Sequence, residues 1–191
     1  LKELKKDQNT LVIFLSDNGA PAEDVAHWGD KAGNNKGPVG TSGSFESQGK
    51  NWAFVSNTPF RSFKSFAYEG GISSPFIAWY PAKIKAGGLL NGTSHLIDIA
   101  PTVYEVAGAK YPTTFKGESI TALPGKSLVP LLFNAQDTPR ETPIFWERAG
   151  NRAVRKGKWK LVSIYPSYAW ELYDVENDRG ETKNLAAQNA G

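Results

Sequence analysis

The chain has 191 residues, 40% of them hydrophobic, and a formal net charge of +3, so it can bury a core of its own and shows no strong basic bias toward nucleic acid. It contains no Cys, which excludes disulfides, thiolate metal sites and a Cys nucleophile within these residues. No apolar stretch approaches the roughly 20 residues that a membrane-spanning helix needs, so no membrane span is expected.

The first predicted element is a buried strand over residues 11–15. This run is rich in β-branched and aromatic residues and lacks polar alternation, which is typical of a strand buried on both faces of a parallel α/β sheet. The chain then reaches Asp17, Asn18 and Gly19. Ligands of such sheets collect beyond the carboxyl ends of the strands, and carboxylate and amide oxygens suit Ca²⁺ or Mg²⁺. The pattern predicts a metal site here, with a simple Asx-Gly turn as the alternative.

A long loop and a second strand follow. Residues 29–50 are dense in Gly, Asn and Ser and lack hydrophobic periodicity, which predicts a functional or disordered loop. Residues 75–80 predict a second buried strand, because an aromatic and apolar run is bounded by turn signals. We expect Gly70 and Gly71 to let the backbone turn tightly before this strand.

Residues 98–108 predict a helix, because an N-cap residue, a Pro in the first turn and a Gly at the C′ position occur together. We expect His95 to tie the start of this helix to the sheet, with Asp98 as its cap or buried partner. Residues 126–133 predict a short helical turn that closes the core.

From Pro143 onward, short strands separated by turn residues predict a small antiparallel sheet. The predicted strands cover residues 144–147, 153–155, 159–164 and 171–175. The same region carries a basic stretch, namely Arg148, Arg152, Arg155, Lys156, Lys158 and Lys160. Attraction of a polyanion is one interpretation. No pattern of a nucleic-acid module accompanies these residues, which favours solvated outer positions of a hairpin.

Several motifs occur in an order that is specific in combination. They are Ser16–Gly19, Gly37–Glu46, Trp52–Arg61, Phe63–Lys64, Tyr68–Pro75, His95–Thr102, Gly157–Leu161 and Trp170–Asp178. With these motifs the chain resembles the C-terminal portion of a type I sulfatase, of the arylsulfatase kind, within the alkaline phosphatase superfamily. The resemblance implies an α/β fold. Residues 1–133 would form the C-terminal part of a doubly wound catalytic sheet, and residues 134–191 a small antiparallel β subdomain.

The family hydrolyses sulfate esters with a hydrated formylglycine and a divalent cation, usually Ca²⁺. The resemblance implies that Asp17 and Asn18 are two ligands of Ca²⁺, with Mg²⁺ as the other candidate, and that Lys64 contacts the sulfate. An ammonium suits that role as a compact charge with three donors, and the alternative for Lys64 is a surface lysine near an aromatic cluster. His27, in the glycine-rich loop, is a candidate substrate contact, with an exposed loop histidine as the alternative.

Parts of the family's machinery do not occur in this sequence. It has no Cys/Ser-x-Pro-x-Arg motif, the source of formylglycine, and no Asp-Asp pair for the metal. Together with the absence of Met and the first residue Leu1, this indicates a mature product, a truncated chain or a fragment. We expect the nucleophile, most of the sheet and the other metal ligands in a missing N-terminal half, which would be the partner of this chain. The isolated chain is therefore expected to be inactive.

Two other functions remain open. The first is a phosphoester or phosphonate hydrolase of the same superfamily, which would share the metal geometry. The second is a non-catalytic module that holds sulfated glycans with Lys64 and the basic hairpin. In the sulfatase interpretation the substrate is an aryl or carbohydrate sulfate ester, nucleic acid is not a partner, and family habit favours a periplasmic or secreted location.

Overall fold

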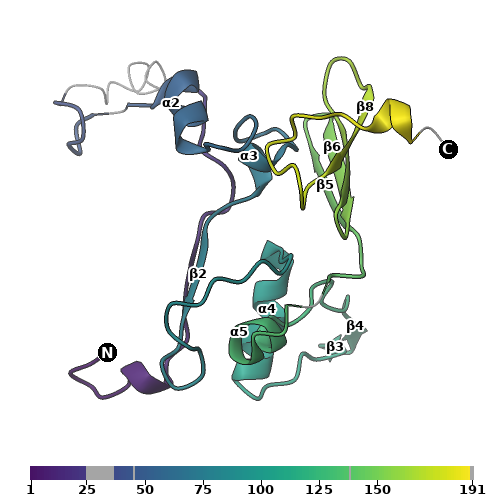
Figure 1. Ribbon diagram of the computed structural model, residues 1–191. Helices are drawn as coiled ribbons and strands as arrows, with labels where there is room; N and C mark the ends of the chain where they lie inside the picture. Colours follow the sequence, from purple (N-terminus) through teal and green to yellow (C-terminus); the bar gives the residue numbers. More distant parts are fainter. Residues whose placement is uncertain (25–36, 45, 138, 190–191) are drawn as a thin grey trace. The chain divides into compact units, whose positions relative to one another are not determined.

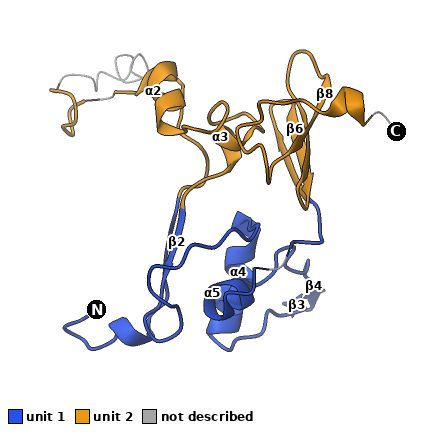
Figure 2. Cartoon of the chain, in the orientation of Figure 1, with its two compact units in different colours: residues 1–15, 76–143 blue, residues 16–75, 144–191 orange. Residues whose placement is uncertain are grey.

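The computed structural model describes residues 1–24, 37–44, 46–137 and 139–189. Its chain divides into two compact units, each assembled from two stretches that are far apart in the sequence (Figures 1 and 2). Unit 1, blue in Figure 2, comprises residues 1–15 and 76–143, and unit 2, orange, comprises residues 16–75 and 144–191. The predicted division at residue 133 stays a prediction. Within the described ranges, no helix has the length and apolar character to cross a bilayer.

Unit 1 combines short helices with two small antiparallel sheets. Its helices are the 3₁₀ helices η1 (Asp7–Asn9) and η2 (Leu96–Asp98) and the α-helices α4 (Ile99–Val106) and α5 (Val129–Asn134). Strands β1 (Val12–Leu15) and β2 (Phe76–Trp79) form one sheet, and β3 (Thr114–Phe115) and β4 (Glu118–Ser119) form the other. The two strands, the helix and the helical turn predicted for this region are confirmed, whereas β3 and β4 were not predicted.

The direction and burial predicted for the first two strands were wrong for the described chain. Strands β1 and β2 pair antiparallel, with Val12 opposite Trp79 and Phe14 opposite Ile77. Burial alternates along both strands, and Phe14 and Ile77 are 65% and 60% exposed. An apolar run does not specify the direction of its neighbour, and two strands alone cannot cover both of their faces.

The start of the 3₁₀ helix η2, which runs directly into α4, confirms that Asp98 acts as a cap and buried partner. The His95 N–H donates to Asp98 Oδ2 (2.8 Å) and the Ile97 N–H donates to His95 Nδ1 (3.2 Å), so the two side chains cap the helix start reciprocally. Asp98 is fully buried, accepts from the Lys126 N–H (2.8 Å) and pairs with Arg140. One carboxylate therefore holds the helix start to the chain segments on either side of α5.

Unit 2 is built around a four-stranded antiparallel sheet in the order β5-β6-β7-β8. The strands are β5 (Ile144–Arg148), β6 (Asn151–Lys156), β7 (Trp159–Ser163) and β8 (Trp170–Asp174), which confirms the predicted C-terminal sheet. The unit also contains α2 (Gly49–Ser56), the short helix α3 (Glu69–Ile72) and the 3₁₀ helix η3 (Ala186–Gln188). Each strand pairs with the next along the chain, so the sheet is a meander.

The core of unit 2 lies between this sheet and the segment that leads into α3 (Figure 1). The buried cluster consists of Ala67, Tyr68, Ala153, Val162, Tyr173 and Val175. Burying one large apolar side chain contributes about 1.5–3 kcal/mol, so a few such contacts fix the position of a loop. Because Ala67 and Tyr68 follow closely on Lys64, the sheet is the surface that holds the Lys64 segment in place.

Candidate active site

The predicted metal ligands Asp17 and Asn18 lie in the turn that follows β1. The Ser16 hydroxyl donates to the Asn18 carbonyl oxygen (2.9 Å), and Asn18 Nδ2 donates to Gly19 O (2.9 Å). None of the described residues donates a hydrogen bond to Asn18 Oδ1 or to the exposed Asp17 carboxylate. Both oxygen groups are therefore open to a ligand.

Gly19 is buried and holds this turn against α3. Its N–H donates to Gly71 O (2.9 Å). A Cβ at Gly19 would lie 1.8 Å from Gly70 O, and a Cβ at Gly71 would lie 2.0 Å from Phe66 O. Both glycines lie in the single turn of α3, and neither has a positive φ, so no left-handed conformation requires them. Their role in the structure is to allow backbone to touch backbone.

A backbone hydrogen bond brings Lys64 to the same turn. The Lys64 N–H donates to Ala20 O (3.1 Å), immediately after the predicted metal ligands and Gly19. Its ammonium lies 3.3 Å from Glu23 Oε1, and both side chains are 40% exposed. The described chain thus gathers a cation and two hard oxygen groups on one pair of loops.

Two residues that lie at these loops were not identified from the sequence. Glu23 is one, and hydrogen bonding to its own backbone N–H, together with the Lys64 ammonium, holds the pKa of its carboxyl below the ordinary value. Asn57 is the other: it stands within a recognised motif, and its side chain bonds to the Ala20 and Lys64 segments. No local pattern marks either residue, because each role depends on which segments meet.

A buried ion network joins α3 to the sheet. Lys160 is fully buried, and its Nζ lies 2.9 Å from Glu69 Oε1 and 2.8 Å from Glu181 Oε1. Glu181 Oε2 accepts from the Glu69 N–H (2.6 Å), and Arg179 pairs with Glu69 Oε2 (3.2 Å). Burial raises the pKa of Glu181. Burial also acts on Glu69, but there the charges of Lys160 and Arg179 outweigh it and lower the pKa.

The basic stretch of β6 and β7 is not a continuous solvated surface. Lys160 is buried in the ion network just described, and Lys158 pairs with Asp174 (3.2 Å). Arg155 Nε donates to Gly157 O (3.0 Å), and burial lowers the pKa of this guanidinium. The interpretation as outer hairpin positions was therefore wrong for Lys160. Its side chain faces the core, where the carboxylates of Glu69 and Glu181 compensate its charge.

A second polar cluster joins the segment before α3 to β8. The Tyr68 and Tyr173 hydroxyls donate to Glu171 Oε2 (2.7 and 2.6 Å). The guanidinium of Arg61 lies 3.9 Å from the centre of the Tyr68 ring and donates to the Tyr173 hydroxyl (2.8 Å). Burial and the bond to Glu171 raise the pKa of both tyrosines well above the ordinary value. The cluster anchors the Lys64 segment and leaves the phenols protonated.

The donor set of this chain fits part of a site for a hard divalent cation. The Asp17 carboxylate and Asn18 Oδ1 are oxygen ligands of the kind that Ca²⁺ and Mg²⁺ prefer. Ca²⁺ takes about six to eight such ligands. Among the residues that the structure describes, no three or more His, Cys, Asp or Glu side chains gather as a metal site. This chain can supply two ligands, and a complete site needs others from elsewhere.

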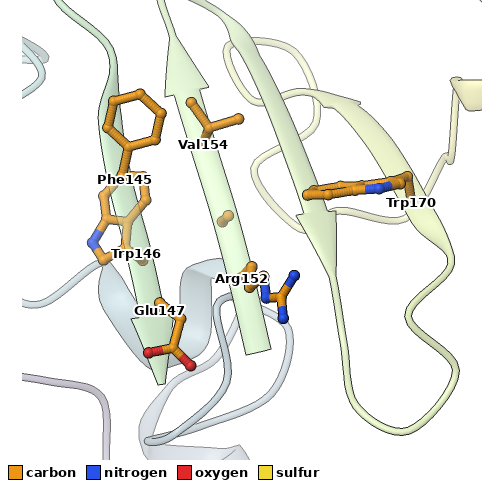
Figure 3. Close-up of a pocket in the computed structure, with 7 residues that line it drawn as sticks. Phe145, Trp146, Glu147, Arg152, Val154 and Trp170 are labelled. Carbon is orange, nitrogen blue, oxygen red and sulfur yellow. The ribbon is translucent and has the colours of Figure 1, made fainter. Parts of the chain in front are cut away.

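His27 falls outside the described residues, so its predicted substrate contact stays a prediction. A mostly apolar pocket of about 480 Å³ lies on the β5–β8 sheet (Figure 3). Its lining consists of Phe145, Trp146, Glu147, Arg152, Ala153, Val154 and Trp170. None of the predicted site residues lines this pocket.

Comparison with known proteins gives two family models that together match almost the whole chain. The model described as Sulfatase matches residues 1–109, and the model described as N-sulphoglucosamine sulphohydrolase, C-terminal, matches residues 60–190. An uncharacterized sulfatase of Schizosaccharomyces pombe is 34% identical over 199 residues, which covers 97% of this chain and 36% of that protein. An arylsulfatase of Klebsiella aerogenes is 36% identical over 135 residues, which covers 67% of this chain and 29% of that protein.

The chain spans about a third of the length of these curated relatives. Among solved structures, the crystal structure of Ps i-CgsB in complex with k-i-k-neocarrahexaose matches with a TM-score of 0.72 and 24% identity. The match covers 100% of this chain and 35% of that one. At this identity the likeness concerns the fold alone.

Proposed function

Because the chain belongs to the sulfatase family, we propose that it is the C-terminal part of a sulfuric ester hydrolase that works with a divalent cation. Its fold class is that of the alkaline-phosphatase-like sulfatases, with mixed helices and a four-stranded antiparallel sheet. The proposed substrates are aryl or carbohydrate sulfate esters.

One contact within this chain supports the proposal independently of its family membership. The hydrogen bond from the Lys64 N–H to Ala20 O (3.1 Å) joins the backbone of Lys64 to the turn that presents two hard oxygen groups, and the Lys64 ammonium lies 3.3 Å from Glu23 Oε1 on the same stretch of chain. A sulfate ester carries negative charge on its oxygens, so an ammonium and a metal ion side by side are complementary to it. The contact supports the proposal that Lys64 and the turn at Asp17 act in one site.

Asp17 and Asn18 are the groups of this chain that would hold the cation. Their oxygens suit Ca²⁺ first, with Mg²⁺ as the alternative. When bound, such a cation offsets the negative charge that develops on the sulfate oxygens and orients the attack. The other ligands, and the formylglycine nucleophile, are expected in an N-terminal half that this chain would need as its partner.

Lys64 would bind the sulfate group through its ammonium. In the free protein this ammonium is paired with Glu23, and both side chains are 40% exposed. An exposed ion pair is worth less than about 1 kcal/mol, so Lys64 can exchange the Glu23 carboxylate for a sulfate oxygen at little cost. The isolated chain would still not turn over sulfate esters, because it holds no nucleophile motif. A periplasmic or secreted location fits the family.

The test is an assay of the complete protein, produced in a host that converts Cys or Ser to formylglycine. We expect hydrolysis of 4-nitrophenyl sulfate, loss of activity with a chelator, and recovery with Ca²⁺ or Mg²⁺. Faster hydrolysis of 4-nitrophenyl phosphate would favour a phosphoester hydrolase instead. No hydrolysis of either ester, with salt-sensitive binding to heparin, would favour a glycan-binding module.

The coding DNA upstream of Leu1 gives an independent check. A Cys/Ser-x-Pro-x-Arg motif preceded by an Asp-Asp pair supports a formylglycine sulfatase. An open reading frame that begins near Leu1 contradicts the proposed function, because the nucleophile would then be absent from the protein.

A further inference from the structure

Asn57 follows the last residue of α2, and both its side-chain and backbone groups are hydrogen-bonded. The Ala20 N–H donates to Asn57 Oδ1 (3.0 Å), and Asn57 Nδ2 donates to Ser62 O (3.3 Å). The Asn57 N–H donates to Ala53 O (3.2 Å), and its carbonyl accepts from the Phe60 N–H (2.8 Å). The backbone of Asn57 is thus fixed by its own neighbourhood, and its carboxamide joins two segments that are far apart in the sequence.

Both of these segments carry residues of the proposed site. Ala20 stands two residues after Asn18, and Ser62 stands two residues before Lys64. The Ala20 carbonyl also accepts from the Lys64 N–H (3.1 Å). The backbone of Ala20 is therefore held by the Asn57 side chain at its N–H and by Lys64 at its carbonyl.

The backbone around Lys64 needs such support. Ser62 and Ser65 have φ values of +67° and +77°, in the left-handed region that residues other than glycine rarely adopt. Conformations of this kind cost free energy and persist only where the surrounding structure holds them. The bond from Asn57 to the Ser62 carbonyl is one of the contacts that hold this segment.

We propose that Asn57 is a positioning residue for sulfate ester hydrolysis, whose carboxamide sets the separation between the proposed cation ligands and the ammonium of Lys64. The proposal rests on the proposed function. Asn57 touches no substrate and acts through the two backbone segments that it joins. Misplacing a charge-stabilising group by about 1 Å lowers turnover by up to about 100-fold. A side chain that fixes this separation therefore has a large effect on kcat without touching the substrate.

An amide is suited to this position because it presents one acceptor and one donor in a single plane. A carboxylate at Asn57 would keep the acceptor for the Ala20 N–H. It would also turn a second oxygen toward the Ser62 carbonyl oxygen, where the two acceptors repel. The variant Asn57→Asp therefore loses the hydrogen bond to the Ser62 carbonyl and keeps the one from the Ala20 N–H, whereas Asn57→Ala loses both.

The test compares Asn57→Ala and Asn57→Asp in the complete protein with the control Ser56→Ala. Ser56 is the neighbouring residue on α2, is exposed, and donates to Gln48 Oε1 (3.2 Å). For 4-nitrophenyl sulfate we expect kcat to fall about 10- to 100-fold in both Asn57 variants, with KM changed by less than about threefold. Ser56→Ala keeps the wild-type kcat.

Hydrogen–deuterium exchange at the Ala20 amide supplies a readout that does not depend on activity. Asn57→Ala removes the acceptor, so this amide exchanges faster. Asn57→Asp keeps the acceptor, so the amide exchanges at nearly the wild-type rate while kcat still falls. A residue with a merely structural role would not separate these two readouts.

Three results would overturn the proposal. They are a wild-type kcat in Asn57→Asp, wild-type exchange of the Ala20 amide in Asn57→Ala, and a loss of activity matched by an equal loss of folded protein in thermal melts. If the wild-type protein hydrolyses no sulfate ester, the proposed function itself fails. Faster Ala20 exchange in Asn57→Ala then still supports the bridge, and unchanged exchange refutes it.

Discussion

Charge is distributed over the proposed site by a few side chains with distinct roles. Asp17 and Asn18 present oxygen atoms, and Lys64 presents a positive charge that Glu23 neutralises in the free protein. A metal site is most sensitive to its ligands, and a charged transition state is most sensitive to the groups aimed at it. Single substitutions at these positions therefore test the roles proposed for them.

In the complete protein, Asp17→Ala and Lys64→Ala are each expected to lower kcat/KM by at least about 100-fold. The physical reason is lost stabilisation of charge in the transition state, with little change in the fold because both side chains are at least partly exposed. The matched control is Lys50→Ala, which removes an exposed lysine on α2. Near-normal turnover in either site variant would remove that residue from the site.

Tyr68 and Tyr173 are expected to resist ionisation. Burial and the bond to Glu171 raise the pKa of both phenols above the unfolded value of about 10. Their contribution to stability is therefore fully present below about pH 10 and is lost as the pH rises toward the folded-state pKa. In ultraviolet titrations up to about pH 11, folded Tyr68→Phe should release as many tyrosine protons as the wild type.

The same titration in denaturant provides the control for this prediction. Unfolded Tyr68→Phe should show one ionising tyrosine fewer than the unfolded wild type, because the environment of Tyr68 is then lost. A loss of one tyrosine already in the folded variant would mean that Tyr68 ionises normally and would contradict the raised pKa.

At the scale of elements, the short helix α3 is the support of the site. Gly19 lets its turn approach α3 to backbone contact, since a Cβ at Gly19 would lie 1.8 Å from Gly70 O, and the two glycines of α3 allow the same close approach to the segment before it. Glu69, at the start of α3, is bound through Lys160 to β7 of the C-terminal sheet. The sheet is thus connected to the site by buried charge as well as by apolar packing.

Lys160→Met is expected to lower the free energy of unfolding by about 3–5 kcal/mol, because it leaves the Glu69 and Glu181 carboxylates buried without their cation. Lys158→Met, two positions earlier on the same hairpin, removes a partly exposed pair and should cost less than about 1 kcal/mol. Urea unfolding of the complete protein measures both values. Equal, small losses for the two variants would refute the network as a support of α3.

At the scale of the whole molecule, one face of the β1–β2 sheet in unit 1 exposes a contiguous set of large apolar side chains to solvent. Val12, Phe14, Ile77 and Trp79 lie on one face of the β1–β2 sheet and are each at least 40% exposed. A contiguous exposed patch of this kind marks an interaction site or a liability for aggregation. We propose that the expected N-terminal half covers it, in keeping with matches that span only 36% and 29% of two curated relatives.

Phe14→Ala in the complete protein should therefore cost about 3–5 kcal/mol, the usual loss for a buried phenylalanine. Leu89→Ala is the control, since Leu89 is 95% exposed and should change stability by no more than about 0.5 kcal/mol. The isolated chain should bind the dye 8-anilinonaphthalene-1-sulfonate more strongly than the complete protein. A cost at Phe14 as small as that at Leu89 would show that the face stays open.

Much of the fold was predictable from the sequence, because its signals are local. The four C-terminal strands follow from two-residue alternation and turn residues, and the start of η2, which continues into α4, follows from the capping residues His95 and Asp98. The order of the motifs identified the family, and the family supplied roles for Asp17, Asn18 and Lys64. Neither the two-residue strands β3 and β4 nor the helix α3 with its two glycines has a signal of this strength.

What the sequence by itself determined is therefore the family, most of the strands and helices outside α2, α3, β3 and β4, and the residue types that carry the proposed chemistry. Only the tertiary structure decided that Lys160 is buried, that Gly71 is needed for contact, and that Glu23 and Asn57 contact the segments that carry the proposed site residues. The physical reason is range. Alternation, caps and turns act between neighbours along the chain, whereas burial and side-chain bridges arise where segments distant in sequence meet, and no local pattern encodes that meeting.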